Sequence, residues 1–169
     1  CMQDKGQLIS GEFVPGRVSL LRKAFDRCGV HCAEALQNDA TVPRPAWGTF
    51  DRVLCDVPCS GLGVIAKKPD IRCKDLAGME NLLQTQQKIL QNGADSLAKN
   101  GRLVYSTCTV NRDENERQVQ KFLTANPDFT LAAPPMAYPG AVDTGLGTLF
   151  LPHKTHTDGF FVAILQKNH

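Results

Sequence analysis

Apolar runs typical of buried strands alternate along this chain with segments of helical periodicity, and this alternation limits the folds that it can adopt. Val53-Leu54-Cys55 is an unbroken apolar run of the kind that a strand covered on both faces of a parallel sheet requires. The chain's longest helical pattern follows and ends at Asn100-Gly101, where a further strand pattern begins, so the two strands should be parallel neighbours. The sequence therefore predicts an α/β fold with a mostly parallel sheet and a closing antiparallel hairpin. Strands are expected at 7–13, 31–36, 50–57, 102–106, 147–151 and 160–165, and helices at 15–28, 76–98 and 113–125.

The length of 169 residues predicts one domain over 1–169, large enough to bury roughly 70% of the surface of its unfolded chain without a disulfide or structural metal. The seven cysteines are odd in number and irregularly spaced, and no apolar signal segment is present, so we expect reduced thiols in a cytoplasmic protein. No stretch approaches the roughly 18 apolar residues of a membrane span. A net charge of +2 permits nucleic-acid binding without demonstrating it.

Two cysteines stand where strand patterns end and loops begin. Cys59 lies in the phrase DVPCSG (56–61), and Cys108 lies in the phrase YSTCT (105–109). Loops at strand ends usually carry the chemistry of such a fold, and a thiolate is an effective nucleophile once its pKa is lowered. The alternative is simple packing, because free cysteine is among the most buried residue types, and Cys55 inside the apolar run fits that interpretation. Two thiols at two strand ends predict a single active site.

A metal site is the competing interpretation of the cysteines. The spacing Cys-x3-Cys, which is loosely that of metal ligands, occurs at Cys28 and Cys32 and again at Cys55 and Cys59. Structural zinc sites favour two close pairs on tight turns, whereas Cys55 is a strand-core position. No Cys-x-x-Cys motif is present to indicate a redox function. We therefore expect no metal and no redox centre.

Three acidic residues occupy expected strand ends: Glu12, Asp39 and Asp56. In an open parallel sheet, ligands bind at the carboxyl ends of the strands, where one acid can accept hydrogen bonds from ribose hydroxyls and the next can reach a base amino group. Each acid taken alone is more often an exposed loop carboxylate. Because all three acids share this position at the ends of expected strands, the sequence favours a nucleotide-like ligand.

Five phrases of the sequence carry a family resemblance: DVPCSGLG (56–63), KPDIR (68–72), GRLVYSTCT (101–109), NE (115–116) and DGFFVA (158–163). Together they resemble the RsmB/Sun family of RNA cytosine-carbon-5 methyltransferases, with the closest likeness to the bacterial RsmB branch, which acts on small-subunit (16S) ribosomal RNA. The resemblance implies a Rossmann-like fold that uses S-adenosylmethionine.

The resemblance implies a division of labour between the two thiols. Cys108 would add to carbon 6 of the cytosine and activate carbon 5 for methylation, and Cys59 would serve as the base in the later steps. Asp56 would hydrogen-bond the cytosine edge, and Pro58 would shape the loop against the base. DNA cytosine methyltransferases place the nucleophile in the Pro-Cys motif instead, so the thiol at Cys108 favours RNA as the substrate.

The resemblance also implies cofactor and RNA contacts. The S-adenosylmethionine contacts are expected at Glu12, Arg17, Asp39 and Asp56. A target base must be unstacked or presented in a loop, and a basic segment beyond the Pro-Cys loop is placed to contact the RNA phosphates. Taken alone, a charged segment of this kind is more often a solvated loop. Its members are Lys67, Lys68, Arg72 and Lys74.

The sequence departs from the family upstream of Glu12, where members carry a strand and a Gly-rich cofactor loop that this sequence does not contain. We expect the sequence to be the carboxy-terminal part of a catalytic domain, truncated on its amino-terminal side. The alternative function is a non-catalytic fragment that binds RNA or self-associates through sheet edges left by the missing strand.

Overall fold

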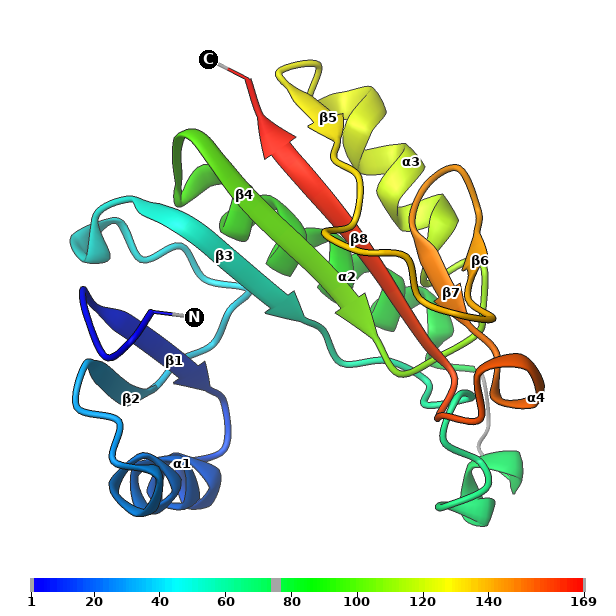
Figure 1. Ribbon diagram of the computed structural model, residues 1–169, viewed down its shortest axis with the longest axis horizontal. Helices are drawn as coiled ribbons and strands as arrows, with labels where there is room; N and C mark the ends of the chain where they lie inside the picture. The colour runs from blue at the N-terminus through cyan, green and yellow to red at the C-terminus, as the bar shows by residue number, and fades with distance from the viewer. Residues whose placement is uncertain (1, 74–76, 169) are drawn as a thin grey trace. The chain divides into compact units, whose positions relative to one another are not determined.

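The computed structural model describes residues 2–73 and 77–168, and it divides into two units, one spanning Cys1–Pro43 and the other Arg44–His169 (Figure 1). Lys74, the last member of the expected basic segment, lies outside the described residues. So does Leu76, where the long helix is expected to begin. Within the described ranges, no helix is long and apolar enough to cross a membrane. The single domain expected over 1–169 stays a prediction.

The first unit is a strand-helix-strand arrangement of β1 (Leu8–Glu12), α1 (Pro15–Cys28) and β2 (Ala33–Gln37). The two strands are parallel, and each residue of β1 from first to last has its partner in β2. Proline in the first turn suits the start of α1, and Gly29, with φ of 64°, ends the helix in the left-handed conformation. The strands and the helix predicted here are confirmed, and the second strand begins two residues later than expected.

In the described part of the second unit, six strands form one mixed sheet. β3 (Phe50–Asp56) runs parallel to β4 (Leu97–Thr107), and β4 pairs in the antiparallel sense with β8 (Phe160–Lys167). The predicted α/β class and closing antiparallel hairpin are confirmed. The sheet, expected to be mostly parallel, is mixed instead, because β8 joins it antiparallel to β4. The order β3-β4-β8 continues through β7 (Thr148–Phe150) to β6 (Val142–Asp143), while β5 (Phe129–Leu131) also pairs with β8.

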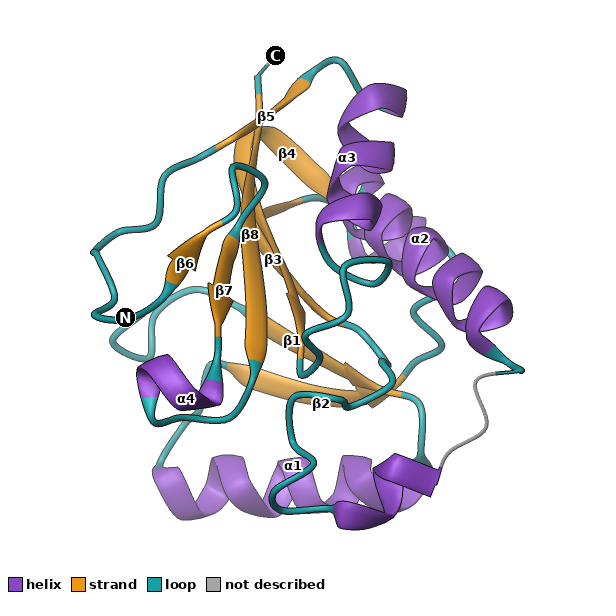
Figure 2. Ribbon diagram, turned by 90° about the vertical axis from the view of Figure 1, so that its right-hand side faces the viewer, coloured by secondary structure: helices purple, strands orange, loops and turns teal. Residues whose placement is uncertain are grey.

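Two long helices, α2 (Met79–Asp95) and α3 (Glu116–Ala125), pack on one face of this sheet (Figure 2). The core lies between them and the sheet, and most of its fully buried side chains come from β4, β8 and the two helices. The shorter elements are α4 (Pro152–Thr155) and the 3-10 turns η1 (Pro45–Trp47) and η2 (Pro69–Cys73). The largest fully buried core side chains are Leu90, Leu97, Leu103, Tyr105, Phe122, Phe161 and Leu165.

Besides the start of α2, which lies at Met79 and not at residue 76, two helix boundaries differ from the sequence prediction. The helix expected to reach residue 98 ends at Asp95, because buried Leu97 pairs with Phe50 and begins β4. The helix expected from residue 113 begins at Glu116, because the backbone before it forms turns. The second difference matters for function, since residues 113–115 border the candidate site.

Gly93 sets how closely α2 approaches the sheet. A Cβ atom at this position would lie 2.6 Å from the Cys55 sulfur, 3.2 Å from a Leu103 methyl and 3.3 Å from a Val53 methyl. These neighbours belong to the packed core, which has no room to give way at low cost. The helix therefore needs a residue without a side chain here.

We predict that Gly93→Ala lowers the free energy of unfolding by about 1–3 kcal/mol through overpacking, although alanine normally stabilises a helix interior over glycine by about 0.5–1 kcal/mol. Urea unfolding followed by circular dichroism measures the change. Gly16→Ala in α1 is the matched control, because a Cβ atom at position 16 would have no neighbour within 4 Å, and it should leave stability unchanged or raised. A Gly93→Ala protein at least as stable as the parent would contradict this packing.

Candidate active site

Cys59 and Cys108 lie side by side at the carboxyl ends of two parallel strands. Asp56, at the end of β3, stands opposite Ser106 of β4, so the chain leaves both strands at the same edge of the sheet. The two sulfur atoms are 3.1 Å apart and partly buried. The structure thus brings together the two thiols that the sequence places at strand ends, and a single small substrate group could contact both.

Burial changes the acidity of one of these thiols. Burial raises the pKa of Cys59 from its ordinary value of 9.0 to about 12, and the hydrogen bond with Cys108 is the second largest cause of this shift. Cys59 therefore carries its proton at neutral pH. Burial alone raises the pKa of Cys55 to about 12 as well, and this thiol faces the core, with its sulfur 3.8 Å from the carbonyl oxygen of Ile89.

The two cysteine loops are joined by direct contacts. The amide of Gly63 donates to the carbonyl of Cys108 at 3.0 Å, and the amide of Gly159 donates to the carbonyl of Gly63 at 2.8 Å. A Cβ atom on Gly63 would overlap the carbonyl oxygen of Gly159, so only glycine allows this approach. The segment after Cys59 is therefore held against both the Cys108 loop and the segment before β8.

A buried polar network lies beneath these loops. Ser60 and Thr109, which directly follow the two cysteines, share a hydrogen bond of 2.9 Å between their hydroxyl oxygens. The carboxylate of Glu114 accepts hydrogen bonds from Ser60 and from Gln86 of α2. Sequence reasoning missed Ser60, Gln86 and Glu114 as members of the site. Their only signal was polarity, which more often indicates exposure.

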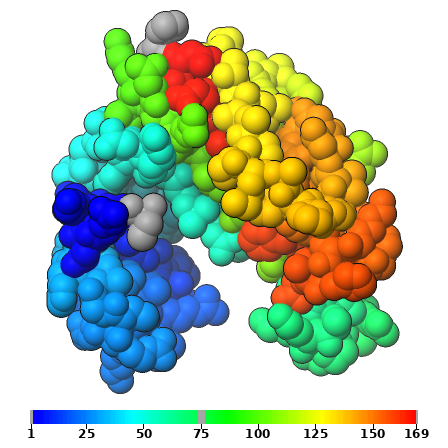
Figure 3. Space-filling view, in the orientation of Figure 1, coloured from blue at the N-terminus to red at the C-terminus, as the bar shows by residue number. Residues whose placement is uncertain are grey.

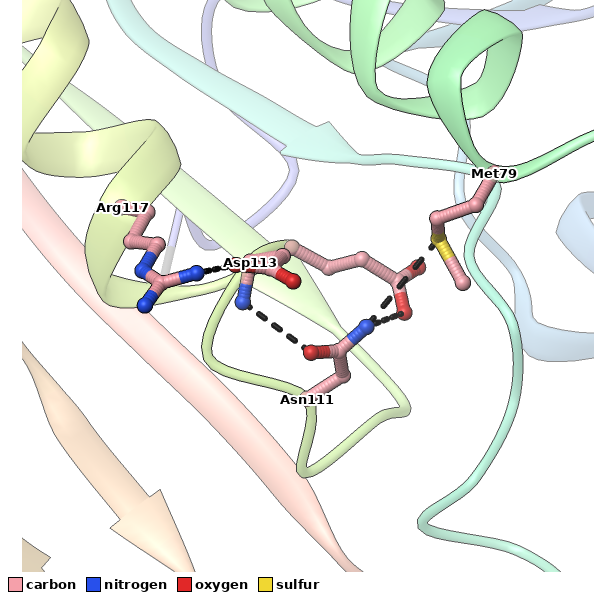
Figure 4. A network of polar contacts seen from close by, with 5 residues as sticks. Met79, Asn111, Asp113 and Arg117 are labelled. Atoms are coloured by element: carbon pink, nitrogen blue, oxygen red, sulfur yellow. Dashed lines mark hydrogen bonds and ion pairs between the residues drawn. The ribbon is translucent and has the colours of Figure 1, made fainter. Parts of the chain in front are cut away.

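Asn111 extends this network toward the surface. Its side-chain amide lies 4.0 Å from the Met79 sulfur at the start of α2, and its amide oxygen accepts a hydrogen bond from the Asp113 backbone at 3.1 Å (Figure 4). The Asp113 carboxylate in turn pairs with Arg117, the second residue of α3 (Figure 4). The loop after Cys108 is thus anchored at several points.

The other two residues predicted to act on the base lie beside the thiols. The Asp56 carboxylate accepts a hydrogen bond from the Ser106 hydroxyl at 2.9 Å and is exposed to solvent. Pro58 is exposed, while its carbonyl accepts a hydrogen bond of 2.9 Å from the buried Gln86 side chain. Both residues are therefore fixed by the protein and open to a ligand.

Three of the four residues expected to contact the cofactor belong to the first unit. Glu12 ends β1, accepts a hydrogen bond from the Val14 amide at 2.9 Å and lies 3.8 Å from the Arg17 guanidinium. Asp39 follows β2 and accepts hydrogen bonds from the amide and hydroxyl of Thr41 at 2.9 and 2.7 Å. The carboxyl ends of the two parallel strands therefore present both acids at one edge. Asp56, the fourth residue, belongs to the second unit.

The basic residues expected to contact RNA are exposed. Lys67 pairs with Asp158 through an N–O distance of 2.6 Å, so this positive charge has a protein partner in the structure. Lys68 directly precedes η2, Arg72 lies within it, and both are exposed to solvent. In Figure 3 the green segment that contains them lies next to the orange segment that contains α4.

The cysteine pairs weighed as metal ligands do not converge. Within residues 2–73 and 77–168, no group of three or more histidine, cysteine or acidic side chains is arranged to hold a metal ion. The backbone amide of Cys32 instead donates a hydrogen bond to Asp4, and Cys28 is exposed at the end of α1.

Comparison with known proteins agrees with this architecture. The family profile described as 16S rRNA methyltransferase RsmB/F matches residues 1–166. The probable ribosomal RNA small subunit methyltransferase B of Synechocystis is 38% identical over 173 residues, which is 98% of this chain and 39% of the relative. Ribosomal RNA small subunit methyltransferase F of Erwinia tasmaniensis is 37% identical over 172 residues, or 98% of this chain and 36% of the relative.

The structure also resembles that of NSun6 from Pyrococcus horikoshii with SFG, at a TM-score of 0.86 and 30% identity, covering 98% of this chain and 42% of that one. Together these matches define an α/β methyltransferase fold. The chain belongs to the RsmB/F family of 16S rRNA methyltransferases, which confirms the family predicted from the motifs. It spans about 39% of the length of the Synechocystis relative.

We predict that Cys59 reacts with iodoacetamide at pH 8 at least about a hundredfold more slowly than exposed Cys73. Only the thiolate form reacts, and burial raises the pKa of Cys59 to about 12. The Cys59 rate should rise about tenfold per pH unit up to pH 11, since each unit below the pKa changes the thiolate fraction tenfold. Mass spectrometry of labelled peptides over time measures both rates. Equal labelling of Cys59 and Cys73 at pH 8 would be evidence against the buried, protonated thiol.

Proposed function

We propose that this chain carries the thiol chemistry of an RNA methyltransferase that methylates carbon 5 of a cytosine in small-subunit ribosomal RNA. The observation that carries the proposal is the pair of sulfur atoms of Cys59 and Cys108, 3.1 Å apart at the ends of two parallel strands. Membership of the RsmB/F family supports a ribosomal RNA substrate. A single thiol would suffice for addition to the base, whereas two adjacent thiols allow addition and proton removal at one base.

In the proposed reaction the Cys108 sulfur bonds to carbon 6 of the cytosine while the thiol proton of Cys108 moves to the ring nitrogen. The addition converts carbon 5 into an enamine-like nucleophile. S-adenosylmethionine, when bound, supplies the methyl group. The Cys59 thiol releases its proton to solvent, and its thiolate then takes the carbon-5 proton. As the bond between carbon 6 and the Cys108 sulfur breaks, the ring-nitrogen proton returns to the Cys108 sulfur, so one proton is released overall.

The environment of Cys59 suits this role. Burial raises its pKa, so the thiolate is a strong base once its own proton has left. Asp56 accepts a hydrogen bond from Ser106 through one oxygen, and its exposed carboxylate can accept another from the amino group or protonated nitrogen of a cytosine. Pro58, held through its carbonyl by Gln86, forms the wall of the loop against the base.

The acids of the first unit fit a nucleoside ligand. Both contacts given above for Glu12 use the oxygen Oε1, and a carboxylate has about four acceptor positions, so Glu12 can also accept from ribose hydroxyls. Asp39, ordered by Thr41 at the neighbouring strand end, is placed to accept from a base amino group. Arg17 orients Glu12. Lys68 and Arg72 supply positive charge for RNA phosphates, and Lys67 can do so by exchanging its partner Asp158.

We predict that, in the full natural protein that contains this sequence, Cys108→Ser abolishes methylation and Cys59→Ala accumulates a covalent RNA adduct. Without Cys108 no bond to carbon 6 forms, and without Cys59 the adduct cannot be released. Methylation is measured by transfer of a labelled methyl group to small-subunit RNA, and the adduct by denaturing electrophoresis. Cys73→Ser, at an exposed position outside the loops, is the control. A Cys59→Ala protein that turns over without an adduct would show that the thiol roles are assigned wrongly.

We predict that S-adenosylmethionine binds and that Asp39→Ala weakens the binding by about tenfold, the cost of one lost hydrogen bond to a charged group. Isothermal calorimetry on the 169-residue chain and on the full natural protein measures it. Asp51→Ala is the control, because Asp51 lies at the amino end of β3, away from the carboxyl ends of the strands.

Binding by the full protein alone would mean that further residues complete the cofactor site. RNA binding with no cofactor binding by either protein would favour the alternative function, a non-catalytic RNA-binding chain. The exposed edge of β3, where Leu54 is 68% exposed, would then be the first surface to test for self-association.

A further inference from the structure

Glu114 is a fully buried acid to which the proposed reaction assigns no step. Its carboxylate accepts four hydrogen bonds: from the Ser60 amide at 2.8 Å, the Ser60 hydroxyl at 2.5 Å, the Gln86 amide at 3.0 Å and the Asn111 amide at 3.2 Å. A carboxylate has about four acceptor positions, so this one is saturated. A buried acid is costly unless it is hydrogen-bonded in this way, which indicates that the arrangement is specific.

The donors connect Glu114 to both cysteine loops. Ser60 directly follows Cys59, and its hydroxyl also contacts the hydroxyl of Thr109, which directly follows Cys108. The hydrogen bond between Ser60 and Thr109 therefore fixes the position of the Cys59 thiol relative to the Cys108 thiol. The Glu114 carboxylate holds Ser60 in place by accepting hydrogen bonds from both the backbone amide and the hydroxyl of Ser60.

Glu114 is itself fixed to the sheet. Its carbonyl accepts a hydrogen bond of 2.7 Å from the hydroxyl of Tyr105, which is fully buried in β4. Burial raises the pKa of Tyr105 far above its ordinary value, so the hydroxyl stays a donor. The neighbouring Asn115 binds the Thr107 hydroxyl at 2.6 Å and the Thr109 carbonyl at 3.0 Å. Glu114 and its neighbour are thus tied to β4, the strand that Cys108 directly follows.

We propose that Glu114 is a positioning residue that sets the separation between the Cys59 and Cys108 sulfur atoms. It acts through Ser60. The consequence for catalysis rests on the proposed function, in which both thiols must reach one base, and a misplacement of about 1 Å can cost about a hundredfold in rate. The separation itself is a property of the folded chain and can be measured without methylation.

The test uses phenylarsine oxide, whose arsenic bonds to two neighbouring thiols and releases one water while both thiol protons move to the oxygen. It is titrated into the 169-residue chain with Cys1, Cys28, Cys32 and Cys73 replaced by serine, so that the site pair and core Cys55 remain. We expect tight binding that Cys59→Ser abolishes. Glu114→Gln should weaken it about tenfold or more, because the amide presents donors where the carboxylate accepts.

Glu116→Gln is the matched control. Glu116 is also a buried glutamate, at 7% exposure, but its oxygen Oε2 has no hydrogen-bond partner within the described residues. Its substitution should leave the arsenical affinity unchanged, whereas a general effect of losing a buried acid would weaken both proteins. A folded Glu114→Gln protein that binds phenylarsine oxide as tightly as the parent overturns the proposal.

Circular dichroism establishes that each variant is folded. If Glu114→Gln does not fold, Ser60→Ala decides, because it keeps the backbone amide and removes the hydroxyl bonds to Glu114 and Thr109. Weaker arsenical binding by folded Ser60→Ala supports the proposal, and unchanged binding overturns it. In the full natural protein, Glu114→Gln should lower kcat for methylation with KM for RNA unchanged. If the parent protein does not methylate RNA, the proposed function fails while the arsenical result still decides the role of Glu114.

Discussion

The parallel pairing of β3 with β4 is the interaction on which the candidate site depends. The register that sets Asp56 opposite Ser106 makes both strands end at one edge, so Cys59, three residues beyond, and Cys108, two residues beyond, meet there. Antiparallel pairing of the same strands would carry the two thiols to opposite ends of the sheet. The pairing is held by apolar side chains on one face of both strands, which pack beneath α2 and α3 and anchor the sheet.

Burial serves packing and chemistry at once in this site. The loops that carry the thiols are withdrawn from water, which raises the pKa of Cys59, yet their polar groups are satisfied by Ser60, Thr109 and Glu114. In a low-dielectric environment a satisfied network is rigid, and each missing partner would leave a costly unpaired group. The same withdrawal from water therefore produces a strong base and the ordered loop that holds it.

The sequence was sufficient to predict what depends on local pattern. Strand periodicity placed both cysteines at strand ends, and Gly29 marked the end of α1, because these features are determined within a few residues. The end of α2 was misplaced because the residues from Asp95 to Ala98 continue a helical pattern, and only the distant partner Phe50 converts Leu97 into a strand residue. Glu114 could not be predicted, since its partner Ser60 lies 54 residues away and a lone acid in a polar run indicates a solvated turn. The cytosine chemistry came from the family motifs and not from periodicity.

The same geometric rule operates twice in the chain. In the first unit, parallel β1 and β2 present Glu12 and Asp39 at one edge, and in the second, parallel β3 and β4 present Asp56 and the two thiols. The first group consists of acceptors suited to hydroxyl and amino groups, and the second combines an acceptor with nucleophilic sulfur. In the proposed function, recognition of a nucleoside and covalent attack on a base make different demands on the protein: the former needs exposed acceptors, and the latter needs thiols shielded from water. Placing them on separate strand pairs allows each environment to be set by its own packing.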